Sequence, residues 1–262
     1  MPAKIPARSR AAVRTTIAAL LVAAAGILLV TYLANTQGSP GASAGQSSQD
    51  ASSQESVPGT APTAGTALAV LATIPVKGKA PHTGYDRVGD FGAAWKDVDG
   101  NGCDTRDDVL ARDLTDVVRN GQCKVLSGVL RDPYSGKTID FVRGERTSAL
   151  VQIDHVVPLS NAWQTGARQL TQQQREALAN DPLELLAVDG PTNESKGDGD
   201  AATWLPANRS FRCAYAARQV SVKAAYRLWV VPAEHDALAR ILDGCRAQPA
   251  WTSTLAPTVG LG

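Results

Sequence analysis

The sequence predicts an α+β domain that follows a low-complexity N-terminal part. Three observations support this class. Strand-like β-branched runs come first in the folded segment and helical patterns follow them. Only one run is long and apolar enough to span a bilayer, which excludes a multi-span membrane protein. No triplet repeat or sustained heptad occurs, which excludes collagen and coiled coil.

The N-terminus has the pattern of an export signal. Lys4, Arg8, Arg10 and Arg14 precede residues 16–34, which carry no charge. At ~1.5 Å per residue this run nearly spans a hydrocarbon core of ~30 Å, which favours an uncleaved anchor. Small residues at 42–44 offer a cleavage site instead. Residues 1–34 are therefore a signal peptide or a signal-anchor helix, and the remainder is secreted or membrane-anchored outside the cytoplasm. Any membrane contact is limited to this helix.

Composition divides the rest of the chain into three parts. Residues 35–66 are rich in Ser, Gly, Ala, Gln, Thr and Pro, which predicts a flexible linker. Residues 67–248 carry the folded domain, and residues 249–262 are expected to be a loose tail. The chain holds 26 Lys and Arg against 25 Asp and Glu. An anionic partner would therefore be bound by a local patch, because the overall charge is nearly balanced.

Periodicity and turn residues predict the elements of this domain in order. An apolar stripe predicts a helix over residues 104–118. Two strand-like runs flank the turn Asp-Pro-Tyr-Ser-Gly at 132–136, which predicts a hairpin. The remaining elements are strands at 151–157 and 183–188 and helices at 160–170, 172–179, 193–196, 209–228 and 232–242.

The cysteines predict disulfides. Cys103, Cys123, Cys213 and Cys245 make an even count in an exported chain. Proximity in sequence favours the pairs Cys103–Cys123 and Cys213–Cys245, one of three possible connectivities. A four-thiolate zinc site is disfavoured because the sequence has no Cys-x2-Cys pair.

One of the three histidines stands out. His82 and His235 lie in polar surroundings and are expected on the surface, whereas His155 follows Asp154 inside an apolar strand. In a regular strand these two neighbours point to opposite faces. At a strand end they can instead surround a metal and its substrate. A core histidine beside a turn aspartate is the alternative for an isolated pair.

The downstream residues favour the functional interpretation. Asp154-His155-Val-Val-Pro is followed by Glu184-Leu185, and Asn193 comes nine residues after Glu184 with Lys196 behind it. This pattern resembles the HNH endonucleases, and most of all the exported actinobacterial group related to the C-terminal nuclease domain of GmrSD-type restriction enzymes. The resemblance implies a ββα-metal core, here elaborated with extra helices and an N-terminal hairpin.

The resemblance also implies a reaction and a metal. His155 would be the general base of an endonuclease that hydrolyses phosphodiester bonds of nucleic acid, DNA rather than RNA. Asp154 and Asn193 would hold one divalent cation, Mg²⁺ or Mn²⁺. Lys196 and Arg143 would contact phosphate.

The sequence departs from the family pattern at one position. Glu184 stands where the family has an asparagine that orients the histidine. A glutamate could orient His155 as a carboxylate does in hydrolytic triads. It could also face away, with Asn180 or Asp181 in that role.

A second metal motif precedes the hairpin. Asp97, Asp99, Asn101 and Asp108 occupy positions of a calcium loop, although Asp104 stands where such loops carry an apolar residue. A plain solvated turn is the competing interpretation. The alternative function is accordingly a non-catalytic cell-envelope module that binds Ca²⁺ or a partner on a degenerate HNH fold.

Overall fold

The computed structural model describes residues 62–257. The predicted export segment and all but the end of the predicted linker lie outside this range. No helix in the described part is long and apolar enough to cross a membrane.

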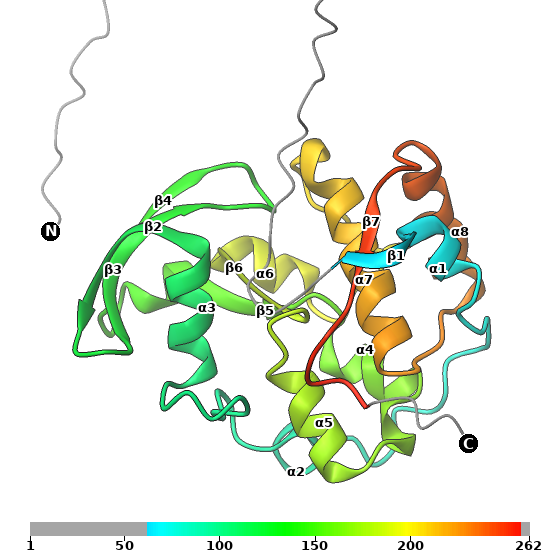
Figure 1. The fold of residues 1–262 in the computed structure, drawn as a ribbon, viewed down its shortest axis with the longest axis horizontal. Coiled ribbons are helices and arrows are strands. Elements are labelled where there is room, and N and C mark those ends of the chain that lie inside the picture. Colours follow the sequence, from blue (N-terminus) through cyan, green and yellow to red (C-terminus); the bar gives the residue numbers. More distant parts are fainter. Residues whose placement is uncertain (1–61, 258–262) are drawn as a thin grey trace, which may run out of the picture. The chain divides into compact units, whose positions relative to one another are not determined.

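Helices and three small sheets alternate along the chain, as the α+β class predicts (Figure 1). In chain order the elements are β1 (Pro62–Thr66), α1 (Ala67–Leu71), α2 (Arg87–Phe91), α3 (Thr105–Asp113), β2 (Leu114–Asn120), β3 (Lys124–Arg131), β4 (Thr138–Val142), β5 (Val151–His155), α4 (Leu159–Gln164), α5 (Gln172–Ala179), β6 (Leu185–Asp189), α6 (Gly190–Lys196), α7 (Arg212–Ala225), α8 (Pro232–Asp243) and β7 (Pro249–Trp251). Short 3-10 turns cover Ser148–Leu150, Ala167–Gln169 and Arg209–Phe211.

The first sheet differs from the expected domain boundaries. Strands β1 and β7 pair antiparallel, so the folded part begins before residue 67 and includes residues that were expected in a loose tail. The physical reason is burial, because Ala250 and Trp251 pack into the main core beside α7. The burial of these two apolar side chains holds the short strand β7 in place, although the residues on either side of it in the sequence are polar or small.

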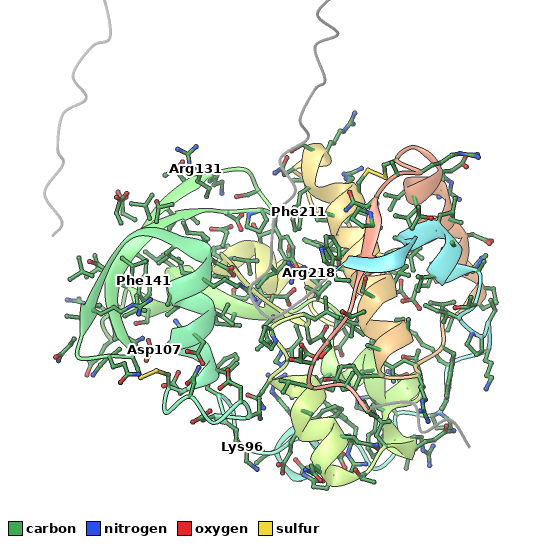
Figure 2. The ribbon with its side chains drawn as sticks, viewed as in Figure 1. Lys96, Asp107, Arg131, Phe141, Phe211 and Arg218 are labelled. Atoms are coloured by element: carbon green, nitrogen blue, oxygen red, sulfur yellow. A yellow bond between two sulfur atoms is a disulfide. The ribbon has the colours of Figure 1, made fainter. Side chains whose placement is uncertain are left out.

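The three-stranded sheet β2-β3-β4 confirms the predicted hairpin and corrects the preceding helix. Strands β3 and β4 pair antiparallel around the predicted turn. Helix α3 ends at Asp113, however, and residues 114–118 belong to β2 rather than to a helix. Thr115, Val117 and Val118 are β-branched, and pairing with β3 satisfies their backbone. Phe141, labelled in Figure 2, lies in the apolar cluster between α3 and this sheet.

Strands β5 and β6 form a two-stranded antiparallel sheet that leads into α6. Asp154 is opposite Leu186 and His155 is opposite Leu185. The chain passes directly from β6 into α6, whose first amides are capped by the Asp189 side chain. Gly190 is required at this junction, because a Cβ there would collide with the Ala149 carbonyl. Helix α6 packs against both strands, so the element order here is strand, strand, helix.

Both predicted disulfides are present. Cys103 and Cys123 join the loop before α3 to the start of β3, with Cα atoms 5.3 Å apart. Cys213 in α7 and Cys245 after α8 are 6.3 Å apart. The second bridge closes a helical group in which α7 packs against α1, α8 and β7.

Candidate active site

Strand β5 places the Asp154-His155 pair on two different faces of the small sheet. The pairing register of β5 with β6 is regular, so neighbouring side chains alternate. Asp154 points toward α6 and α7, and His155 points away from them toward α5 and the segment before α3. Both side chains are nearly inaccessible, at 6% and 7% exposure. The pair therefore forms two environments that must be described separately.

On the α6 side, Asp154 is engaged at both carboxylate oxygens. Lys196 Nζ donates to Oδ1 at 2.9 Å and the Tyr134 hydroxyl donates to Oδ2 at 2.5 Å. Lys196 also donates to the His155 backbone carbonyl at 2.7 Å, and its side chain is fully buried. Burial raises the pKa of Asp154, and the Lys196 ammonium opposes that shift. Lys196 is thus engaged within the fold, and its contact with a phosphate stays a prediction.

Asn193 lies one helical turn before Lys196 and does not contact Asp154. Its side-chain amide donates to Gln152 Oε1 at 2.9 Å. Gln152 is two residues before Asp154 and thus on the same strand face. Asp154 and Asn193 carry the oxygen donors that Mg²⁺ prefers. In this structure the Lys196 ammonium lies against the Asp154 carboxylate, so a divalent cation held by Asp154 and Asn193 would have to displace it. The described residues also contain no group of three His, Cys, Asp or Glu that could hold a metal.

On the opposite face, His155 has a defined tautomer. Its Nε2 lies 2.9 Å from the Ala179 carbonyl oxygen, which can only accept a hydrogen bond. Nε2 therefore carries the proton in the neutral ring, and Nδ1 keeps its lone pair. Burial, with a smaller contribution from the positive charge of Arg87, lowers the pKa of His155 to about 3. The imidazole is neutral at physiological pH, which is the form a general base needs.

A cavity of about 50 Å³ opens beside His155. Trp95 forms one wall, with its ring nearly parallel to the imidazole at 13° and 6.3 Å between centroids. Arg87 and Asn180 also line it. The Asn180 side-chain oxygen is buried without a hydrogen-bond partner in the described structure. The space is large enough to hold a water molecule.

Glu184 does not orient the His155 ring. Its Oε2 accepts a hydrogen bond from the Val157 backbone at 3.2 Å, and its Oε1 has no partner in the described part. The side chain is fully buried, and this burial raises its pKa well above the usual range. Asn180 and Asp181, the alternatives for this role, bond elsewhere, and the Ala179 carbonyl holds the ring instead. A backbone group leaves no side-chain signal, so the sequence could not have identified it.

Arg143 is also committed to a structural contact. Its guanidinium pairs with the buried Asp107 of α3 and donates to the Val125 carbonyl. A contact of Arg143 with phosphate stays a prediction. Asp107 is labelled in Figure 2 on the helix beside the three-stranded sheet.

The calcium-loop residues form a turn closed by its own amides. Asp97 accepts hydrogen bonds from the Gly100 and Gly102 backbones, and Asp99 accepts one from Asn101. Asp108 lies in α3, where burial raises its pKa and the nearby negative charges of the loop add to the effect. Ca²⁺ binding stays a prediction at this loop.

Comparison with known proteins identifies the family. The family described as GmrSD restriction endonucleases, C-terminal domain, matches residues 104–241, which is more than half of the chain. A protein of Arthroderma benhamiae named "Uncharacterized secreted protein" is 39% identical over 186 residues, covering 70% of this chain and 87% of that relative. The chain belongs to the GmrSD C-terminal domain family. No solved structure matches it significantly.

The buried ion pair yields a first prediction. Lys196→Met leaves Asp154 buried and unpaired, which should cost ~3–5 kcal/mol of unfolding free energy. Asp154→Asn combined with Lys196→Met should cost less than the sum of the single changes, because the charge that lacks a partner is gone. Urea unfolding of wild type, both single variants and the double variant measures this coupling. Additive losses would contradict the account.

The buried Glu184 carboxyl yields a second prediction. Because its folded-state pKa is raised, its contribution to stability is present at low pH and is lost as pH rises above the ordinary value of 4.5. Glu184→Gln keeps an acceptor for the Val157 amide and cannot ionise. Its unfolding free energy should therefore fall less with rising pH than that of wild type, by up to ~1.4 kcal/mol per pH unit. Parallel stability curves from denaturant unfolding at pH 5 to 9 would refute this.

Proposed function

We propose that this protein is an exported endonuclease of the HNH type that hydrolyses phosphodiester bonds of nucleic acid, DNA rather than RNA. The observation that carries the proposal is the state of His155, which is neutral, is fixed through Nε2 and lines a cavity large enough for a water molecule. The strand-strand-helix order of β5, β6 and α6 supports assignment to the ββα-metal class. Family membership supports a nuclease as the broader class.

Two observations support export. The relative from Arthroderma benhamiae is named as secreted. Two disulfides are typical of proteins that fold in an oxidising compartment. We propose that the folded domain acts outside the cytoplasm, either released or held by the N-terminal segment.

In the proposed reaction, His155 Nδ1 takes a proton from a water molecule in the cavity. The water oxygen forms a new bond to phosphorus while the bond from phosphorus to the leaving oxygen breaks. The leaving oxygen receives a proton from solvent, and the imidazolium returns its proton to solvent. An anionic phosphodiester close to the ring would raise the depressed pKa of His155 and make it a better base.

The divalent cation is a separate part of the proposal. When bound, Mg²⁺ or Mn²⁺ would stabilise negative charge on the phosphoryl group. Asp154 and Asn193 are the candidates to hold it, and Lys196 would first have to leave Asp154. No step above depends on the cation.

The competing function is a non-catalytic module that binds Ca²⁺. The observation in its favour is that Asp108 is held near the negative charges of Asp97, Asp99 and Asp104, a repulsion that a cation would relieve. Such a module would leave nucleic acid intact, so the nicking experiment separates the two functions.

A third prediction tests the general base. His155→Ala should lower nicking of supercoiled plasmid by ~10²–10⁴-fold, because the substitution removes the general base. Gel assays should use the full chain with added Mg²⁺, with Mn²⁺ and with chelator, so that the metal requirement is read at the same time. His82→Ala is the matched control and should keep wild-type activity, since His82 is exposed and lies outside the cavity. Equal nicking by a folded His155→Ala protein would overturn the mechanism.

A further inference from the structure

The cations that the sequence suggested for phosphate binding are both committed elsewhere. Lys196 is buried against Asp154, and Arg143 is paired with Asp107. A phosphodiester attacked by water at His155 Nδ1 still needs a positive partner, because its negative charge grows in the transition state. That partner must lie on the face of β5 from which His155 projects, since the imidazole ring lies there.

Arg87 has the required position. It begins helix α2, and its side chain lines the His155 cavity. Among the residues that line this cavity, it is the one with a permanent positive charge. His155 lines the same cavity, so the two residues are neighbours although they are far apart in sequence.

Arg87 is also available. The residue is exposed, and no ion pair is found for it within residues 62–257. Its guanidinium interacts with the Tyr85 hydroxyl, a neutral group that leaves its charge uncompensated. A guanidinium in this state can bind two oxygens of one phosphate.

The size of the cavity determines which reactant can bind inside it. A volume of about 50 Å³ can hold water but is too small for a nucleotide, so we place the phosphate outside the cavity, beside the exposed Arg87. A larger cavity of about 330 Å³ shares Asn180 with the first one. Its lining includes Asp99 and Asp108, and the one guanidinium among its lining residues, that of Arg112, is already paired with Asp113. The two carboxylates therefore disfavour a phosphate on that side.

We propose that Arg87 binds the scissile phosphate of the nucleic-acid substrate at the mouth of the His155 cavity. This inference rests on the proposed function. Arg87 precedes the segment matched by the family, so the assignment comes from its position in the fold. Trp95 lines the same cavity beside the His155 ring.

Binding measured without turnover tests this proposal. The parent protein is the full chain carrying His155→Ala, and the probe is a fluorescein-labelled DNA duplex followed by fluorescence anisotropy. Adding Arg87→Gln should raise Kd by about 10- to 100-fold, as expected for loss of one charge-assisted contact. The slope of log Kd against log salt concentration should decrease by about 1, as expected for the loss of one phosphate contact. Arg87→Lys should recover part of the affinity.

Arg240→Gln in the same parent is the matched control. Arg240 is exposed on α8, outside the cavity, and should leave Kd and salt slope unchanged. Circular dichroism and melting temperature verify that each variant is folded. Unchanged binding by Arg87→Gln, or equal losses in Arg87→Gln and Arg240→Gln, would overturn the role of Arg87 and leave the proposed function intact. Absence of DNA binding by the parent, with no nicking by wild type, would overturn both.

Discussion

The contact between Lys196 and Asp154 organises the centre of this fold. A fully buried ammonium bonds both the Asp154 carboxylate and the backbone carbonyl of the next residue, so helix α6 is fixed to the end of strand β5. The hydroxyl of Tyr134, which lies in the hairpin turn, donates a hydrogen bond to the second oxygen of the Asp154 carboxylate. A buried charge needs such partners, because an unpaired one is expensive to desolvate. One aspartate therefore connects three parts of the chain that are distant in sequence.

The strand geometry separates this structural role from the proposed chemistry. Alternation along β5 directs Asp154 into the packed interface with α6 and directs His155 to the other face. There the ring is held by a backbone carbonyl and stacked against Trp95, and Arg87 lines the same cavity. The ion pair thus fixes the end of β5 on one face, and the proposed general base His155 projects from the opposite face. The succession of β5, β6 and α6 brings the ion pair and the histidine together at this strand end.

Local signals predicted much of the fold and less of the site. The β3–β4 hairpin and helix α5 agree with the sequence because their turn, capping and periodic residues lie within a few positions of each other. The helix expected over residues 104–118 was half wrong, since an apolar stripe in β-branched residues also fits a strand that has a partner. Lys196 was recognised as important, but its role depends on burial, which sequence alone does not state. Arg87 and Trp95 were missed because only tertiary packing brings them to His155.

The central claim is that His155 is neutral, with its proton on Nε2 and a free lone pair on Nδ1. Nitrogen-15 NMR of histidine-labelled protein measures this directly, with His155→Gln to assign the signal. The account predicts a Nε2–H tautomer at pH 7 and a protonation midpoint far below 6.5, near the pKa of about 3. A ring that titrates near 6.5, or one that carries its proton on Nδ1, would contradict it.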